Sequence, residues 1–148
     1  MQFKITTLVA KPLEQVFDGF DERLFVEMNP PFPFPRVRVL RFDGCRLRDE
    51  VHLQLCFLGF FRQSWISIIT QKELNANEIN FTDTGYTLPV FLRQWKHQHI
   101  LQRTNGDKTL ITDHVNFEAA TWLPNWLLYP MLYLMFSFRK PIYRRFFK

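Results

Sequence analysis

The order of hydrophobic patterns predicts an α+β fold, in which a curved antiparallel sheet of seven strands surrounds a long C-terminal helix. Three observations favour it. One strand pattern precedes short helical stretches, six further strand patterns follow with no helix between them, and residues 122–147 have helical spacing. The 148 residues are the usual length of one domain and can bury a sizeable core. We therefore expect a single domain over residues 1–148.

The N-terminal segment combines one strand with short helices. Residues 2–9 alternate between apolar and polar side chains, as a half-buried strand does. Pro12 can open a helix, because its missing N–H is not needed there. A second helical piece at residues 23–28 leads into residues 29–35, which contain four prolines and must form an extended loop.

Turn-forming residues then separate six strand patterns. We expect strands at residues 36–43, 46–57, 62–73, 79–86, 90–103 and 108–118. Asp43-Gly44 predicts a hairpin-type turn, and Asn105-Gly106 is a strong hairpin signal. A three-residue loop at Asn105-Gly106 would set His99 opposite Asp113, whereas a two-residue loop would shift the pairing by one and separate these groups.

The C-terminal segment is strongly apolar. Its run from Trp122 to Phe138 has 17 residues, whereas a membrane-spanning helix needs about 20, so we favour an amphipathic helix held by the sheet. Pro124 and Pro130 are expected to kink or split this helix. The aromatic side chains expected to point at the sheet are those of Trp126, Tyr129, Tyr133, Phe136 and Phe146.

Composition narrows the function classes. Aromatic residues make up 17% of the chain, which suits a core or a site for a large apolar ligand. The net charge is +5, and much of the positive charge lies at the C-terminus. The favoured explanation for these basic residues is a solvated helix end, and binding to an anionic ligand or to a membrane surface are the alternatives. Binding to nucleic acid is not expected, because the arginines of residues 36–46 are typical of the exposed outer surface of a sheet.

The cysteines and the N-terminus indicate a reducing compartment. Cys45 and Cys56 have no Cys or His neighbour at zinc spacing and are expected to be free thiols. The N-terminal sequence MQFKITTLVAKPLEQ lacks the continuous apolar stretch of a signal peptide. We therefore expect a cytoplasmic protein, with membrane association as an alternative.

Three segments resemble the SRPBCC, or START-like, superfamily, which includes polyketide cyclases and Bet v 1-like proteins. The opening FKITTLVAKPLEQVF is similar to its first strand and helix, where Ala/Ser-x-Pro-x-Glu-x-Val-Phe is common. The stretch FTDTGYTLPVFLRQWKHQHIL resembles the F-x-D…G-P-F…W-x-H-x-H-x-F pattern of a bacterial, uncharacterised ligand-binding subfamily, and TLITDHVNFEA resembles its T-x-x-x-D-x-V-x-Y/F strand. Leu88-Pro89-Val90-Phe91 stands where Gly-Pro-Phe is usual, and Pro124 lies later than the typical proline. The resemblance implies a helix-grip fold with an internal cavity, and it leaves the function open because the superfamily has many functions.

A polar cluster is expected inside this cavity. Residues two apart on a strand share a face, so Trp95, His97 and His99 point the same way, and Asp83 and Asp113 lie on the apolar sides of their strands. A satisfied hydrogen-bond network is the favoured interpretation, a polar anchor for a ligand is the second, and general acid–base catalysis is the third. We expect no metal and no cofactor, because a His-x-His pair is a weak signal and the nearest other histidine, His114, has the opposite parity.

The predicted function is binding of a hydrophobic small molecule, such as a lipid, an isoprenoid or a polyketide-like compound. The residues expected to line its cavity are Phe57, Phe81, Trp95, His97, His99, Phe117, Trp126, Tyr129, Tyr133 and Phe136. One alternative is a cyclase or dehydratase that uses His97 and His99 with Asp83 and Asp113. The other alternative is a peripheral membrane protein that handles lipids and contacts the membrane through its C-terminal helix and basic tail.

Overall fold

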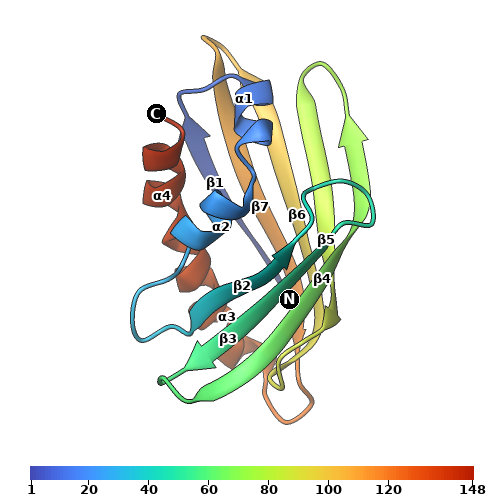
Figure 1. Ribbon diagram of the computed structural model, residues 1–148, viewed down its shortest axis with the longest axis vertical. Coiled ribbons are helices and arrows are strands. Elements are labelled where there is room, and N and C mark those ends of the chain that lie inside the picture. The colour runs from blue at the N-terminus through green and yellow to red at the C-terminus, as the bar shows by residue number, and fades with distance from the viewer.

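One antiparallel sheet of seven strands curls around the C-terminal helices in the computed structural model, which describes residues 1–148 (Figure 1). The strands are β1 (Gln2–Val9), β2 (Arg36–Phe42), β3 (Glu50–Phe57), β4 (Phe61–Leu74), β5 (Glu78–Thr87), β6 (Leu92–Thr104) and β7 (Lys108–Ala119). Their order across the sheet is β1-β7-β6-β5-β4-β3-β2, so only the β1–β7 pairing joins the two ends of the chain. The predicted α+β helix-grip architecture is confirmed.

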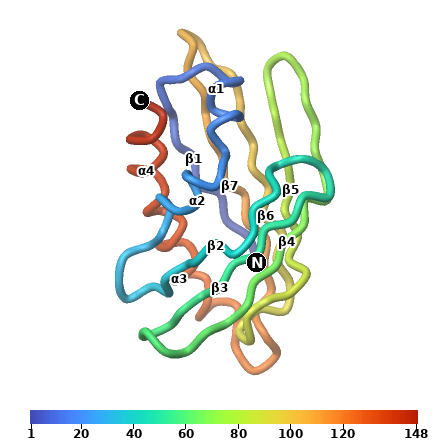
Figure 2. Tube along the Cα trace, in the orientation of Figure 1, coloured from blue at the N-terminus to red at the C-terminus, as the bar shows by residue number.

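Four helices complete the fold. They are α1 (Leu13–Asp18), α2 (Glu22–Glu27), α3 (Asn125–Ser137) and α4 (Arg139–Phe146). The chain trace in Figure 2 follows α3 and α4 along β1, and contacts of α4 with β1 and of α3 with β1 and β7 agree with that view. None of these helices is long and apolar enough to cross a bilayer.

The predicted long C-terminal helix is divided at Phe138. Pro141 explains the position, because a proline ring clashes with the carbonyl group four residues earlier, which here belongs to Ser137 at the end of α3. The two prolines expected to divide the helix do not do so. Pro124 precedes α3 as its N-cap residue, and α3 continues past Pro130.

The connection between β2 and β3 also differs from the prediction. Residues 46–49 were expected to be strand, but β3 begins at Glu50 and residues 43–49 form a longer loop than an Asp43-Gly44 hairpin. Acidic side chains hold this loop: Asp43 accepts a hydrogen bond from the backbone N–H of Glu50 at 3.1 Å, and Asp49 accepts one from that of Arg46 at 2.9 Å. Such local bonds compete with pairing between strands.

Alternation along β1 confirms how this strand contributes to the core. Phe3, Ile5, Thr7 and Val9 are buried, and the residues between them are exposed. The buried apolar side chains form two clusters, one that includes residues of α1, α2 and α4 and one that includes residues of α3. The polar cluster described below lies where these two apolar clusters meet.

Candidate functional site

The register of the β6–β7 hairpin brings the predicted polar residues together. Thr104 pairs with Lys108, so the loop has three residues, and two of them, Gly106 and Asp107, adopt positive φ angles of 75° and 54°. This register sets His99 opposite Asp113. The three-residue alternative is therefore the one that the chain adopts.

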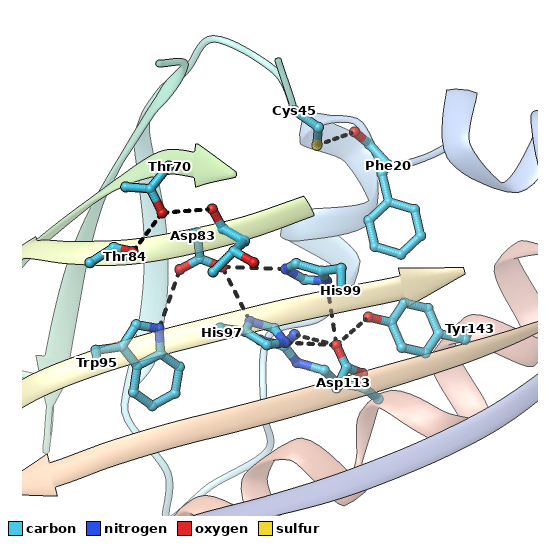
Figure 3. Close-up of polar contacts among 12 residues, drawn as sticks. Phe20, Cys45, Thr70, Asp83, Thr84, Trp95, His97, His99, Asp113 and Tyr143 are labelled. Carbon is cyan, nitrogen blue, oxygen red and sulfur yellow. Dashed lines mark hydrogen bonds and ion pairs between the residues drawn. The ribbon is translucent and has the colours of Figure 1, made fainter. Parts of the chain in front are cut away.

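The neighbouring strand β5 contributes the second carboxylate. Asp83 pairs with His97 across β5 and β6, so the two aspartates and two histidines occupy adjacent positions on three neighbouring strands (Figure 3). Cross-strand partners have Cβ atoms only about 4.5–5.5 Å apart, which lets their side chains meet. All four side chains point to the same side of the sheet.

Each imidazole lies between the two carboxylates. His97 Nε2 hydrogen-bonds with Asp113 Oδ1 at 2.9 Å, and its Nδ1 lies 3.3 Å from Asp83 Oδ2. His99 Nε2 lies 3.3 Å from the same Asp83 oxygen, and its Nδ1 lies 3.5 Å from Asp113 Oδ1. The rings are 3.8 Å apart between centroids. The four side chains thus form one polar cluster, which we call the His–Asp cluster.

Aromatic rings enclose the His–Asp cluster. The ring of His99 stacks on Phe81 with 4.5 Å between centroids, and the ring of His97 meets Phe136 edge to face at 5.1 Å. These apolar neighbours exclude water, so the charges of the cluster interact more strongly than they would on the surface.

Three further polar side chains complete the cluster. Trp95 donates a hydrogen bond through Nε1 to Asp83 Oδ1 at 3.3 Å, and the Tyr143 hydroxyl donates one to Asp113 Oδ1 at 3.3 Å (Figure 3). Arg139 Nη1 lies 3.7 Å from the same Asp113 oxygen, and its guanidinium lies 3.9 Å from the ring centre of Phe136. Asp113 therefore receives contacts from strand β6 and from α4.

Burial and charge shift the pKa values of this cluster in opposite directions. Burial alone would raise the pKa of both aspartates, but their contacts with His97 and His99 outweigh burial and hold both pKa values below the ordinary range. Burial alone would lower the pKa of His99, but its contacts with Asp113 and Asp83 outweigh burial and raise that pKa. The two carboxylates thus face the imidazole of His99, whose pKa they raise, and the guanidinium of Arg139.

The Tyr143 hydroxyl stays protonated as a donor to Asp113. Burial and the negative charge of Asp113 both raise the pKa of Tyr143. Because a neutral phenol can donate its proton in a hydrogen bond, Tyr143 helps to hold the Asp113 carboxylate in place.

A cavity of about 100 Å³ adjoins the His–Asp cluster. It lies among strands β2–β6 and helices α2 and α3, and 17 of its 24 lining residues are hydrophobic. Asp83, His97, His99 and Arg139 also lie in its wall, whereas Asp113 is behind the histidines, with its side chain 1% exposed. The cavity therefore combines an apolar wall with a small group of charged side chains.

Half of the residues expected to line the cavity do so. The structure places Phe81, Trp95, His97, His99 and Phe136 in the wall. Phe117 is fully buried in the core instead, and Phe57 packs between Phe61 and Phe91.

The other three expected residues lie on α3 outside the cavity wall. Tyr129 and Tyr133 stack on each other and both meet the ring of Phe3 on β1 edge to face at 5.7 Å, so they point at the sheet as expected. Trp126 does not, because its side chain is 69% exposed. The buried face of α3 consists of Leu128, Leu132 and Phe136, which are spaced by four residues and so share one side of the helix. Tyr143 of α4 and Phe147, directly after α4, are buried, whereas the expected Phe146 is half-buried against the same core cluster.

Sequence reasoning missed the roles of Arg139 and Tyr143. Arg139 was grouped with the solvated basic tail, and Tyr143 was not singled out. Their spacing did carry a signal, because Arg139 and Tyr143 follow the buried Phe136 by three and seven residues, the spacing of one helical face.

Comparison with solved structures shows the fold family. No protein-family model matches the sequence, and no curated protein matches it either. Zhui aromatase/cyclase from Streptomyces sp. R1128 shares 16% identity over 82% of this chain and 69% of its own, with a TM-score of 0.56. A START superfamily protein from Mycobacterium smegmatis shares 16% identity over 95% and 90% of the two chains, with a TM-score of 0.60. Ara h 8.0201 shares 15% identity over 97% and 95%, also with a TM-score of 0.60. The chain has the START-like fold.

Proposed function

We propose that the protein binds a hydrophobic small molecule, such as a lipid, an isoprenoid or a polyketide-like compound, in the cavity between the sheet and α3. The observation that carries this proposal is the largely apolar wall, 17 of 24 residues, with a few charged groups. Burial of apolar ligand surface would contribute about 25 cal/mol per Å² before the costs of ordering. The likeness to a START superfamily protein and to an aromatase/cyclase supports the proposal.

Ligand binding requires the cavity to widen. Its volume of about 100 Å³ is below the roughly 300–1,000 Å³ of pockets that hold drug-sized molecules. Three methionines, Met28 near α2 and Met131 and Met135 on α3, lie in the wall. Methionine side chains are unbranched and adapt readily to new shapes, so we expect these residues to move when a ligand enters.

Arg139 is the group that would hold the polar end of the ligand. Its Nη1 atom is buried and has no hydrogen-bond partner, although it lies near Asp113. A buried donor without a partner is costly, so a ligand oxygen placed beside it would gain a strong, charge-assisted hydrogen bond. We therefore propose a ligand with an acceptor group, such as a carbonyl or a carboxylate, at one end of an apolar body.

Native mass spectrometry of the full chain purified from cells tests this proposal. We expect an added mass that denaturation releases. The variant Ser67→Phe adds a ring at a buried cavity position on β4 and should abolish the added mass, whereas Leu40→Phe adds the same ring at an exposed position on β2 and should retain it. No added mass under any condition, including incubation with lipid extracts, would count decisively against the proposal.

A second candidate function is catalysis of a cyclisation or dehydration. It is favoured by the position of His97 and His99, which line the cavity, where a general acid or base could reach a bound molecule, and which contact both carboxylates. Once a ligand is identified, the double variant His97→Gln, His99→Gln should lose turnover while the protein remains folded. Unchanged turnover in that variant would exclude catalysis by these residues.

Contact with a membrane surface is favoured by exposed apolar side chains. Trp122, Trp126, Leu127 and Leu134 are all more than half exposed around the start and the outer side of α3. Apolar groups on a helix surface can enter the interface of a bilayer. Flotation of the protein with liposomes should therefore weaken in the variant Trp126→Ser, and the absence of any flotation with neutral or anionic liposomes would exclude this contact.

A further inference from the structure

Three metal-binding atoms converge where the His–Asp cluster meets the cavity. They are Asp83 Oδ2, His97 Nδ1 and His99 Nε2, and the carboxylate oxygen lies 3.3 Å from each of the two nitrogens. Each of the three residues has a ligand atom within 4.8 Å of those of the other two. Two imidazoles and one carboxylate are a ligand set that binds zinc and related transition metals. We propose that Asp83, His97 and His99 form a binding site for a divalent transition-metal ion of the zinc type.

The distances suit tetrahedral coordination. Zinc lies about 2.0–2.1 Å from histidine nitrogen and carboxylate oxygen, so two ligand atoms on a tetrahedron are about 3.3–3.4 Å apart. The two distances from Asp83 Oδ2, to His97 Nδ1 and to His99 Nε2, are both 3.3 Å. The two imidazole rings are 3.8 Å apart between centroids, so a small movement of the rings would complete the triangle of ligand atoms.

Asp113 occupies the position of an outer-shell partner. Metal-binding histidines commonly donate their other ring N–H to a carboxylate, which fixes the tautomer and the ring orientation. Both histidines turn that other nitrogen to Asp113 Oδ1, His97 Nε2 at 2.9 Å and His99 Nδ1 at 3.5 Å. Asp113 is itself held by the Tyr143 hydroxyl. The nitrogens that face Asp83 are therefore the ones free to bind a metal.

A network of ion pairs without a metal explains the His–Asp cluster less completely than a metal site does. Buried polar atoms almost always have hydrogen-bond partners, yet His99 Nδ1 and Asp113 Oδ2 have none. A metal on His99 Nε2 would place the proton on Nδ1, where Asp113 is the nearest carboxylate. The sequence argued against a metal because a His-x-His pair is a weak signal and His114 has the opposite parity. The β5–β6 register strengthens that signal, because it sets the Asp83 carboxylate opposite His97.

Three protein ligands leave one tetrahedral position open. Zinc sites with three protein ligands usually complete their coordination with water or a bound molecule. Because Asp83, His97 and His99 all line the cavity, that position is on the cavity side. The metal site does not depend on the proposed ligand, since it rests on the protein's own donors.

Titration with metal ions alone tests the site. The full chain is treated with EDTA, dialysed, and titrated with zinc chloride by calorimetry and with cobalt chloride by visible absorption. We expect one ion per chain and the intense absorption bands of tetrahedral Co²⁺. Absence of one-to-one zinc binding, or a cobalt spectrum of the weak octahedral type, would overturn the proposal.

Variants assign the binding to these residues. His99→Gln and Asp83→Asn should lose one-to-one zinc binding, and Asp113→Asn should weaken it about 10–100-fold. The matched control is the double variant His52→Gln, His114→Gln, which removes the two histidines outside the cluster and should bind zinc as the wild type does. Loss of binding in this control would show surface sites only and would overturn the proposal. If a cluster variant fails to fold by circular dichroism, the cobalt spectrum of the wild type decides.

Discussion

The substitution Asp113→Asn removes the most enclosed charge in the protein. The Asp113 side chain is 1% exposed, and its Oδ1 lies 2.9 Å from His97, 3.5 Å from His99 and 3.7 Å from Arg139. An asparagine keeps the size of the side chain but leaves the Arg139 and His99 cations with fewer counter-charges. Breaking a buried ion pair by removing one partner costs about 3–5 kcal/mol, so we expect the free energy of unfolding at pH 6 to fall by about that much.

A surface carboxylate supplies the matched control. Glu50 Oε2 lies 2.8 Å from His52 Nε2 and 3.0 Å from Arg41, but all three side chains are partly exposed. Exposed ion pairs contribute about 0–1 kcal/mol, so Glu50→Gln should change the free energy of unfolding by less than about 1 kcal/mol. Urea unfolding followed by tryptophan fluorescence measures both variants in the presence of EDTA. An Asp113→Asn protein within about 1 kcal/mol of wild type would refute the view that this carboxylate balances the buried cations.

Three further predictions follow from burial and pKa shifts. The free energy of unfolding in EDTA should be highest between about pH 4 and 6.5. Below about pH 4 the two aspartates, whose pKa values are lowered in the folded protein, become protonated and their stabilising contacts are lost, and above about pH 6.5 His99, whose pKa is raised, loses its proton with the same effect. Urea titrations that show stability rising between pH 6.5 and 8 would contradict this prediction. Leu132→Ala, on the buried face of α3, should lower the free energy of unfolding by about 2–5 kcal/mol, whereas Leu134→Ala, on the exposed face, should change it by less than about 0.5 kcal/mol. Thermal unfolding measures both variants, and equal changes would contradict the orientation of α3. Desolvation raises the pKa of the half-buried Cys45 thiol from 9.0 to about 12, so its alkylation by iodoacetamide at pH 8 should be about 1,000-fold slower than that of an ordinary thiol. Peptide mass spectrometry measures the rate, and a normal rate would contradict the raised pKa.

The sheet could be predicted from the sequence because strand periodicity is strong. Alternation in β1, and the parity that puts Asp83, His97, His99 and Asp113 on apolar sides, follow directly from a period of two residues. The one undetermined quantity was the loop length at Asn105-Gly106, where a difference of one residue would have put these groups on opposite faces. The four residues of the His–Asp cluster were thus predictable except for a single register, whereas Arg139, Tyr143 and half of the cavity wall were not.

The C-terminal helices could not be oriented from the sequence. Nearly every residue of α3 is apolar, so no polar face marks which side is buried. The aromatic residues were a partial guide, because Tyr129, Tyr133 and Phe136 contact Phe3 of β1 but Trp126 is exposed. The position of the helix break depended on Pro141, whose ring acts four residues upstream.

Tryptophan fluorescence offers the most direct test of the central claim that an apolar ligand enters the cavity beside the His–Asp cluster. Trp65 and Trp95 lie in the cavity wall, whereas Trp122 and Trp126 are exposed outside it. A brominated apolar compound, such as bromonaphthalene, quenches tryptophan on contact. In the double variant Trp122→Phe, Trp126→Phe, which retains only the cavity pair, we expect saturable quenching that Ser67→Phe abolishes. Quenching that never saturates, or that occurs only when the two exposed tryptophans are present, would contradict the claim.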